Sequence, residues 1–240
     1  MFTHQGRKRT TSHNLQIASL LSFVAGIVNV AGFLAIHKLT TNVTGHFAFF
    51  LDEVFRLDFW QGLIYFLYIF FFFSGSFLSG FLVEYIARRN SNYTYIIPTA
   101  IEGMILLVVA VFGADLILEN PNGIAFTLLF AMGLQNSLVT RISNATVRTT
   151  HLTGLFTDLG IELSQLFFIR EILLRKKLFT SIKLRFTIIG FFFTGGVVGG
   201  IFYSQMGLHV LLFGVVALML GLIYDSIKLR MLKLTRKYRN

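Results

Sequence analysis

Two short stretches of the chain combine threonine hydroxyls with a glycine at the same spacing. Thr40–Gly45 reads Thr-Thr-Asn-Val-Thr-Gly, and Thr149–Gly154 reads Thr-Thr-His-Leu-Thr-Gly. Such residues suit a helix N-terminus, where free backbone amides can point at an anion or a polar solute. They would also serve simply as a helix cap, but their duplication favours a solute site. The candidate residues in the two elements are Thr41, Asn42, Thr44, Gly45, Thr150, His151, Thr153 and Gly154.

Three amide side chains, those of Asn29, Gln135 and Asn136, fall inside apolar stretches. In a membrane-spanning helix an amide commonly hydrogen-bonds to a neighbouring helix, which contributes about 1 kcal/mol. The three amides could equally contact a solute, and the two roles are compatible. Asn29 and Asn136 each follow a glycine by three residues, so they could meet near an axis that relates two halves of the protein.

Glu102 is a candidate for coupling protons or ions. It lies about two helical turns into an apolar stretch, and an ionisable group at such depth indicates a functional site by default. The alternative is that its side chain snorkels to the membrane interface or pairs with Arg88 or Arg89.

Asp158 is the second candidate for proton or ion coupling. Asp158 and Glu162 are four residues apart, a spacing that places both carboxylates on one face of a helix. The pair could bind a cation or relay protons. It could also face water or pair with Arg148.

The histidines and the known motifs give no sign of a metal, a cofactor or an enzyme. His151 is one member of the second threonine-glycine element, but no other potential ligand stands at metal-binding spacing around it. His46 and His209 are expected at surfaces or interfaces. The chain contains no phosphate-binding loop, no dinucleotide fingerprint, no zinc-protease motif and no nucleophile elbow. We therefore expect no metal, no cofactor and no enzymatic activity.

The composition predicts that these residues sit in a membrane. The chain has 240 residues, of which 55% are hydrophobic and only 13% charged, with a mean hydropathy of +0.71. A soluble domain has about 25% charged residues, so the polar material is too scarce to cover a water-facing surface. The absence of cysteine excludes disulfides and thiolate metal sites.

Spanning a bilayer takes about 20 mostly apolar residues in a helix. The sequence predicts six such spans, at Leu15–Ile36, Trp60–Ala87, Tyr93–Leu116, Gly123–Val139, Leu184–Tyr203 and Leu208–Ile227. We interpret the first as an uncleaved helix rather than a signal peptide, because no small-residue cleavage site follows it. With the N-terminus inside, 19 of the 21 Lys and Arg residues fall on the cytoplasmic side. The net charge of +10 is thus an orientation signal, and no nucleic-acid partner is expected.

The two halves of the chain resemble each other. Besides the threonine-glycine elements, Phe71–Gly80 corresponds to Phe191–Gly200 in residue order. Each half holds three spans, an odd number, which predicts inverted repeats with a working site near the midplane. The predicted fold is therefore an all-α polytopic membrane protein of six transmembrane helices in two inverted three-helix repeats. The expected divisions are a basic tail at 1–14, repeats at 15–118 and 119–228, and a basic tail at 229–240.

A short apolar segment follows each threonine-glycine element, at Gly45–Phe55 and Gly154–Phe168. Both are too short or too polar to span the bilayer. We expect re-entrant helices or halves of broken helices, which are tolerated only where they line a cavity or are buried in protein. The small residues around Gly195–Gly200 and their first-half counterparts are expected to form close-packing helix faces.

A further pattern lies in Ala131–Asn136, Val147–Gly154 and Asp158–Gly160. These segments resemble one signature of the YoaK family, also known as the DUF1275 family, of small bacterial membrane proteins. Phe23–Gly26 with Asn42–Gly45 is similar to the other signature, although His46 stands where the family often has Asn. The resemblance covers the chain from about Leu20 to the last span. It implies a bacterial multi-pass membrane protein and supplies no substrate.

These observations favour a secondary transporter or facilitator of a small polar or anionic solute, held at the interface of the two repeats. We expect it in the bacterial inner membrane with both termini cytoplasmic, in contact with membrane lipids, and possible as a homo-oligomer. The alternative function is a non-transporting scaffold or a membrane protein that binds lipid or protein through its basic connection. An enzyme acting on lipid within the membrane is a weaker third reading.

Overall fold

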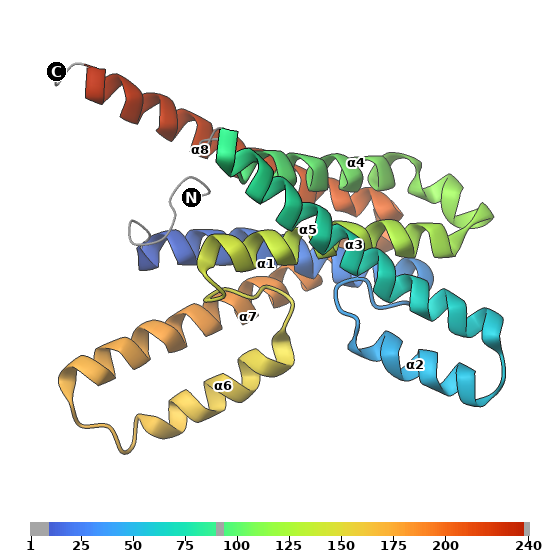
Figure 1. The fold of residues 1–240 in the computed structure, drawn as a ribbon, viewed down its shortest axis with the longest axis horizontal. Helices are drawn as coiled ribbons and strands as arrows, with labels where there is room; N and C mark the ends of the chain where they lie inside the picture. The colour runs from blue at the N-terminus through green and yellow to red at the C-terminus, as the bar shows by residue number, and fades with distance from the viewer. Residues whose placement is uncertain (1–9, 90–93, 238–240) are drawn as a thin grey trace.

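The computed structural model describes residues 10–89 and 94–237, and these residues form helices without any strand. Helix bounds in chain order are α1 Thr11–Ile36, α2 Thr44–Phe55, α3 Phe59–Arg89, α4 Ile96–Glu119, α5 Pro121–Ser143, α6 Leu152–Gln165, α7 Ile172–Met206, a 3-10 turn Gly207–Val210, and α8 Leu211–Lys237. The long helices form a bundle in which α1 runs parallel to α7 and α3 runs parallel to α5, and two shorter helices diverge from it (Figure 1).

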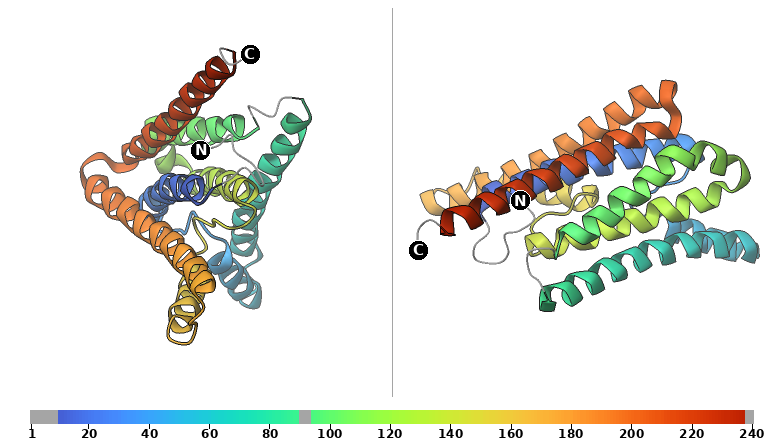
Figure 2. Two further views of the ribbon diagram at one scale, coloured as in Figure 1. Left: turned by 90° about the vertical axis from the view of Figure 1, so that its left-hand side faces the viewer. Right: turned by 90° about the horizontal axis from the view of Figure 1, so that it is seen from above.

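Helices α1 and α5 form the centre of the bundle and are its most buried long helices (Figure 2). α1 packs along α7, and α5 packs along α3. Each central helix therefore pairs chiefly with a helix from the other half of the chain. The core that results is apolar, and Ile17, Leu21, Leu128 and Met132 lie within it fully buried.

Glycines make the two principal helix pairs possible. A β carbon on Gly26 of α1 would overlap the carbonyl oxygen of Phe192 on α7, and one on Gly133 of α5 would overlap the carbonyl oxygen of Phe72 on α3. Gly26 and Gly133 occupy corresponding positions of the two halves. The same close backbone approach, which only small residues permit, therefore occurs at both pairs.

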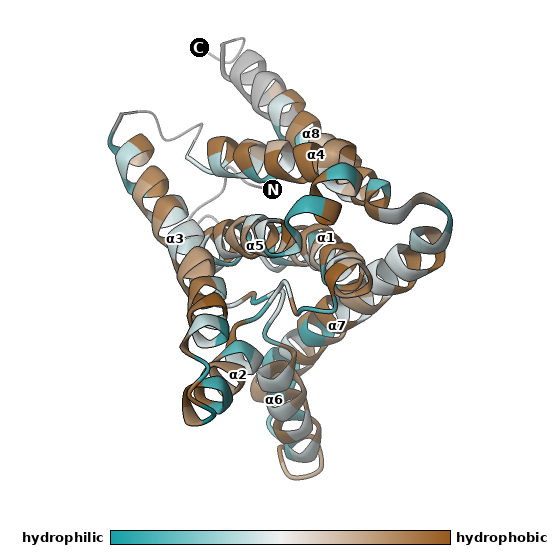
Figure 3. Ribbon diagram, turned by 90° about the vertical axis from the view of Figure 1, so that its right-hand side faces the viewer, coloured by the Kyte–Doolittle hydropathy of each residue, from teal (hydrophilic) through white to brown (hydrophobic). Residues whose placement is uncertain are grey.

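Five stretches of the described residues are long and apolar enough to cross a membrane. Four of them are α1, α3, α4 and α5, and the fifth, Ile172–Ile227, contains α7, the turn at Gly207 and most of α8. Large apolar side chains, including Phe73, Phe77 and Phe193, are exposed on the outside of the bundle. Brown, apolar residues cover the helices throughout (Figure 3). An outer surface of this kind fits hydrocarbon, and the chain is a multi-pass membrane protein.

Two helix boundaries differ from the sequence prediction. α7 begins at Ile172 rather than at Leu184, because Arg175, Lys176 and Lys177 lie on exposed positions of its first turns. Lys and Arg are good helix formers, but a span that is predicted from its mean hydropathy stops where such charged residues begin. α8 likewise continues to Lys237, so the expected tail at 229–240 begins inside a helix. The expected division between the repeats falls at the junction of α4 and α5.

The two predicted short helices are present as α2 and α6. Irregular segments, residues 37–43 and 144–151, connect them to the ends of α1 and α5. α2 and α6 begin near the middle of the bundle's length and run outward toward opposite ends (Figure 1). The threonine-glycine elements therefore lead from the ends of the central helices back to the interior of the molecule.

Candidate functional site

The first threonine-glycine element is anchored to α1. Thr41 donates a hydrogen bond to the side-chain oxygen of Asn29 over 2.7 Å, and Thr40 donates to the carbonyl oxygen of Val28 over 3.1 Å. The residue that precedes α2, Val43, gives the helix no side-chain cap. The interpretation of these threonines as caps is therefore wrong: the hydroxyls fix the connecting segment to α1 and leave the N-terminus of α2 uncapped.

The second element repeats this arrangement on α5. Thr150 donates to the side-chain oxygen of Asn136 over 2.8 Å, and Gln135 donates both to Thr149, over 3.3 Å, and to the carbonyl oxygen of Leu21, over 3.0 Å. His151, which precedes α6, gives that helix no side-chain cap. Of the three predicted amides, only Gln135 bonds a neighbouring helix, whereas Asn29 and Asn136 hold the connecting segments. Asn29 and Asn136 each bond to a threonine of their own half, and no hydrogen bond joins them to each other within the described residues.

The remaining predicted residues lie at the starts of the two short helices. Thr44, His151 and Thr153 are exposed, and Asn42 is half-buried. The ring of His151 lies directly over Gly154, where a β carbon would overlap it. Gly45 is the counterpart of Gly154 and lies beside Leu39. The threonine side chains at the starts of α2 and α6 are therefore exposed, whereas the ring of His151 covers Gly154.

A polar cavity of about 450 Å³ opens beside the second element. It lies between the first turn of α1, the connection from α5 to α6, and α7. Its lining residues are Thr11, Asn14, Ala145, Thr146, Arg148, His151, Gly154, Leu155, Asp158, Lys177, Thr180, Ser181, Leu184 and Arg185. Three of these side chains are basic and one is acidic. The N-termini of α1 and α6 add partial positive charge, so the cavity favours an anion.

Arg185 organises the carboxylates at this cavity. Its guanidinium donates to Asp158 over 2.9 Å and to both oxygens of Glu162 over 2.8 and 2.9 Å. The side chain of Ser181 also donates to Glu162, over 2.6 Å. The alternative in which Asp158 pairs with Arg148 is therefore wrong, because the carboxylate bonds Arg185 on α7. Burial raises the pKa of Glu162, but hydrogen bonds from Arg185 and Ser181 outweigh it, and the pKa lies below its ordinary value.

Sequence analysis missed Arg185 as a site residue. One signal was available: an arginine at the second position of a predicted span is an ionisable group in an apolar run, for which a partner should be sought. Its partners lie on α6, some twenty residues earlier in the chain. Only the tertiary fold brings Asp158 and Glu162 close to Arg185.

The corresponding place in the first half is filled with aromatic rings. Phe49 stacks on Tyr65 with ring centroids 5.2 Å apart, and His46 contacts Tyr68 with centroids 4.8 Å apart. Lys38 donates to the hydroxyl of Tyr65 over 2.9 Å. The expectation that His46 lies at a surface is wrong, because its side chain is buried and its ring bonds the carbonyl oxygen of Leu39. α2 also packs along α3 more extensively than α6 packs along α7.

The correspondence of these two places follows from their distance to the repeat glycines. Phe49 and Asp158 each lie four residues after the glycine of their threonine-glycine element. Tyr65 and Arg185 each lie ten residues before the first glycine of the next shared motif. The same backbone positions therefore carry a ring stack in one half and an ion pair in the other.

Glu102 lies apart from the polar cavity. It is fully buried on α4, and neither carboxylate oxygen has a hydrogen-bond partner among the described residues. The alternatives of snorkelling and of pairing with Arg88 are therefore wrong, and the side chain of Arg89 lies outside the described residues. Asp225 on α8 is a second fully buried carboxylate that sequence analysis did not single out, although it lies inside a predicted span.

The described residues hold no group of three or more His, Asp or Glu side chains that could bind a metal ion. Among known protein families, the model of the family described as "Protein of unknown function (DUF1275)" matches residues 17–224. Compared with curated proteins and with solved structures, the chain matches none.

Proposed function

Because the chain belongs to the DUF1275 family and is a multi-pass membrane protein, we propose that it carries a small anionic solute across the bilayer as a secondary transporter or facilitator. The observation that carries the proposal is the polar cavity at the second threonine-glycine element, where Arg148 and Lys177 lie beside the ion pairs of Arg185 with Asp158 and Glu162. Three bases against two carboxylates give the site a net positive charge, which suits an anion.

In the proposed topology, α7 and α8 cross the membrane separately, which gives six crossings, and the two halves are inverted repeats. The paired contacts support this. Gly26 and Gly133 make the same close approach, and Thr41 and Thr150 make the same hydrogen bond. The basic excess places both termini on the cytoplasmic side of the cell membrane, which for a bacterial protein is the inner membrane.

The short helices have lengths that suit half a bilayer. At 1.5 Å per residue, α2 with 12 residues and α6 with 14 extend about 18 and 21 Å. Half of the hydrocarbon core is about 15 Å. A helix that starts at the midplane therefore ends in the headgroup region, and we assign α2 and α6 as re-entrant helices that approach the midplane from opposite sides.

The difference between the two halves supports alternating access. On the side of α6 the cavity is open, and on the side of α2 the rings of Phe49, Tyr65 and Tyr68 fill the corresponding place. We assign the structure to a state open toward the cytoplasm. The opposite state would close α6 onto α7 and separate α2 from α3, as rocking of one repeat against the other predicts.

Labelling tests the cavity directly because the chain has no cysteine. A Thr146→Cys variant places a single thiol at an exposed position in the lining of the cavity. In inverted and right-side-out vesicles, a membrane-impermeant maleimide should label it from the cytoplasmic side, and an excess of the transported anion should slow the labelling. A Phe193→Cys variant, on an exposed apolar position of α7, is the control and should stay unlabelled from both sides.

Transport in proteoliposomes tests the function. Labelled phosphate, sulfate and small carboxylates should be screened with the natural protein, followed by Thr153→Val and Asp158→Asn. A Thr194→Val variant, which changes an exposed hydroxyl on the outside of α7, is the matched control. Uptake of one anion should fall in the first two variants and not in the control. If no anion is taken up, or if the site variants leave every uptake unchanged, the proposal fails.

A further inference from the structure

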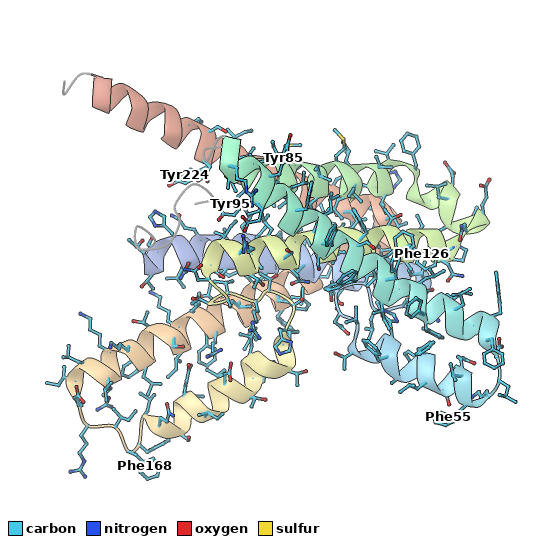
Figure 4. All side chains as sticks on the ribbon, in the orientation of Figure 1. Phe55, Tyr85, Tyr95, Phe126, Phe168 and Tyr224 are labelled. Atoms are coloured by element: carbon cyan, nitrogen blue, oxygen red, sulfur yellow. The ribbon has the colours of Figure 1, made fainter. Side chains whose placement is uncertain are left out.

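The tip of the hairpin formed by α6 and α7 exposes large apolar side chains. Phe167 and Phe168 are 86% and 82% exposed, and Ile172 and Leu173, at the start of α7, are 82% and 68% exposed. Phe168 lies at the outer end of the hairpin, pointing away from the bundle (Figure 4). No part of the described chain covers these side chains.

Basic residues surround this apolar tip. Arg170, Arg175, Lys176 and Lys177 are all exposed, and none of them forms an ion pair with a described residue. Glu171 is the only acidic residue between Ser164 and Lys177. Apolar side chains flanked by unpaired bases suit a bilayer surface that carries anionic headgroups.

The tip of the other hairpin has the opposite charge. Between α2 and α3, Phe55 and Trp60 are 85% and 71% exposed. Their neighbours include the carboxylates of Asp52, Glu53 and Asp58, and the one base there, Arg56, pairs with Asp52 over 3.0 Å. Both tips therefore have apolar anchors, but only the tip of α6 and α7 has free positive charge.

A groove of about 390 Å³ lies beside the basic tip, where α7 passes the first turn of α1. It is lined by Thr11, Leu173, Lys176, Lys177 and Thr180. Two ammonium groups and the hydroxyl of Thr11 can donate to phosphate oxygens, whereas the hydroxyl of Thr180 already donates to the carbonyl oxygen of Lys176. Leu173 at the same groove can contact the start of an acyl chain. The groove therefore offers a site for both the headgroup and the tail of a single molecule.

The length of α7 places this groove at the right depth. Its 35 residues extend about 52 Å, whereas the hydrocarbon core is about 30 Å thick. The polar first turns of the helix therefore reach past the core into the headgroup layer. There they meet the phosphates of lipids that surround the protein.

We propose that the tip of α6 and α7 binds an anionic phospholipid, with the phosphate held by Lys176 and Lys177 in the groove and with Phe167 and Phe168 in the membrane interface. A soluble phosphate would use the groove but leave the exposed rings in water. A lipid of the surrounding leaflet can fill the groove and also surround the exposed rings. The groove adjoins the transport cavity and shares Thr11, Lys177 and Thr180 with it, whereas Leu173, Lys176 and the exposed rings lie outside the cavity.

The natural protein has a single tryptophan, Trp60, at the acidic tip, so tryptophan fluorescence can report on each tip separately. A Trp60→Phe/Phe168→Trp variant moves the reporter to the basic tip. Both proteins are reconstituted in vesicles that contain acyl-brominated phosphatidylglycerol or acyl-brominated phosphatidylcholine at equal mole fraction. We expect the anionic lipid to quench the relocated tryptophan at least about twofold more than the neutral lipid does. Fluorescence of natural Trp60 should be quenched equally by both lipids.

Charge variants in the same reporter background complete the test. Lys176→Gln/Lys177→Gln should abolish the preference for the anionic lipid, whereas Lys183→Gln, an exposed base of α7 outside the groove, should retain it. Soluble glycerol phosphate should not reduce the quenching. An unquenched reporter at the basic tip, equal quenching by both lipids, or displacement by glycerol phosphate would overturn the proposal. Unchanged melting temperatures will show that each variant is folded.

Discussion

The guanidinium of Arg185 on α7 donates to the carboxylate of Asp158 on α6 over 2.9 Å, at the repeat position where Tyr65 stacks on Phe49 in the first half. An ion pair at the edge of a polar cavity and a ring stack in a filled one differ in how readily they separate. Water can solvate the separated charges, whereas separated rings would expose apolar surface. The two halves thus use the same backbone positions for different contacts: an ion pair joins α6 to α7, and stacked rings join α2 to α3.

Replacing the base of this pair should destabilise the protein. Arg185→Gln leaves Asp158 and Glu162 without their partner, and the side chain of Glu162 is only 14% exposed. Breaking a fully buried pair costs about 3–5 kcal/mol, and we expect about 1–3 kcal/mol here because Asp158 is half exposed. Thermal unfolding in detergent measures the change. Lys183→Gln, an exposed base on the same helix, should have little effect. Equal melting temperatures for both variants would refute the assigned role of Arg185.

The close helix approaches predict that Gly→Ala substitutions destabilise the protein at the contact positions and not elsewhere. Gly26→Ala and Gly133→Ala each place a methyl group against a backbone carbonyl of the partner helix. Overpacking of this kind costs about 1–3 kcal/mol, since the backbone must move. Gly160→Ala and Gly190→Ala meet nothing within 4 Å and should be neutral or slightly stabilising, because alanine is the better helix former. Melting temperatures that do not separate the two groups would contradict the helix packing.

The shifted carboxyl group predicts how stability depends on pH. The pKa of Glu162 lies below its ordinary value of 4.5, with burial opposing the shift and bonds from Arg185 and Ser181 causing it. The ionised form is therefore favoured in the folded protein. Its contribution to stability is complete above pH about 4.5 and is lost as the pH falls through the lowered pKa. Melting curves of Glu162→Gln should show less destabilisation by acid than those of the natural protein. Parallel acid dependence in the two would exclude this role.

Glu102 should tolerate an uncharged isostere. Both its oxygens are buried without a partner, and burying an unpaired charge costs several kcal/mol, so the neutral acid is the form that the bundle accommodates. The free energy of unfolding of Glu102→Gln, measured by thermal melting, should therefore lie within about 1 kcal/mol of that of the natural protein. If Glu102 couples protons, the same variant will take up the anion without responding to an imposed pH gradient. A gradient response equal to that of the natural protein would remove Glu102 from the coupling mechanism.

The sequence by itself determined the class of protein and its internal correspondence. Scarce charges and long apolar runs force the backbone into helices within a bilayer, because no water is available there to satisfy its polar groups. The apolar composition and short length of the segments after Gly45 and Gly154 likewise predicted two short helices. The amides of Asn29, Gln135 and Asn136 were recognisable because a polar side chain inside an apolar run needs a partner.

Only the tertiary structure decided which groups meet. The hydroxyls of Thr41 and Thr150 bond Asn29 and Asn136 rather than capping a helix, because the connecting segments fold back along α1 and α5. Asp158 found Arg185 rather than Arg148, because α6 lies against α7 and the choice of partner depends on that contact. A search for apolar spans missed the start of α7 because Arg175, Lys176 and Lys177 interrupt the apolar run there. Local pattern fixes what a segment can form, whereas its partners are set by packing between segments distant in the chain.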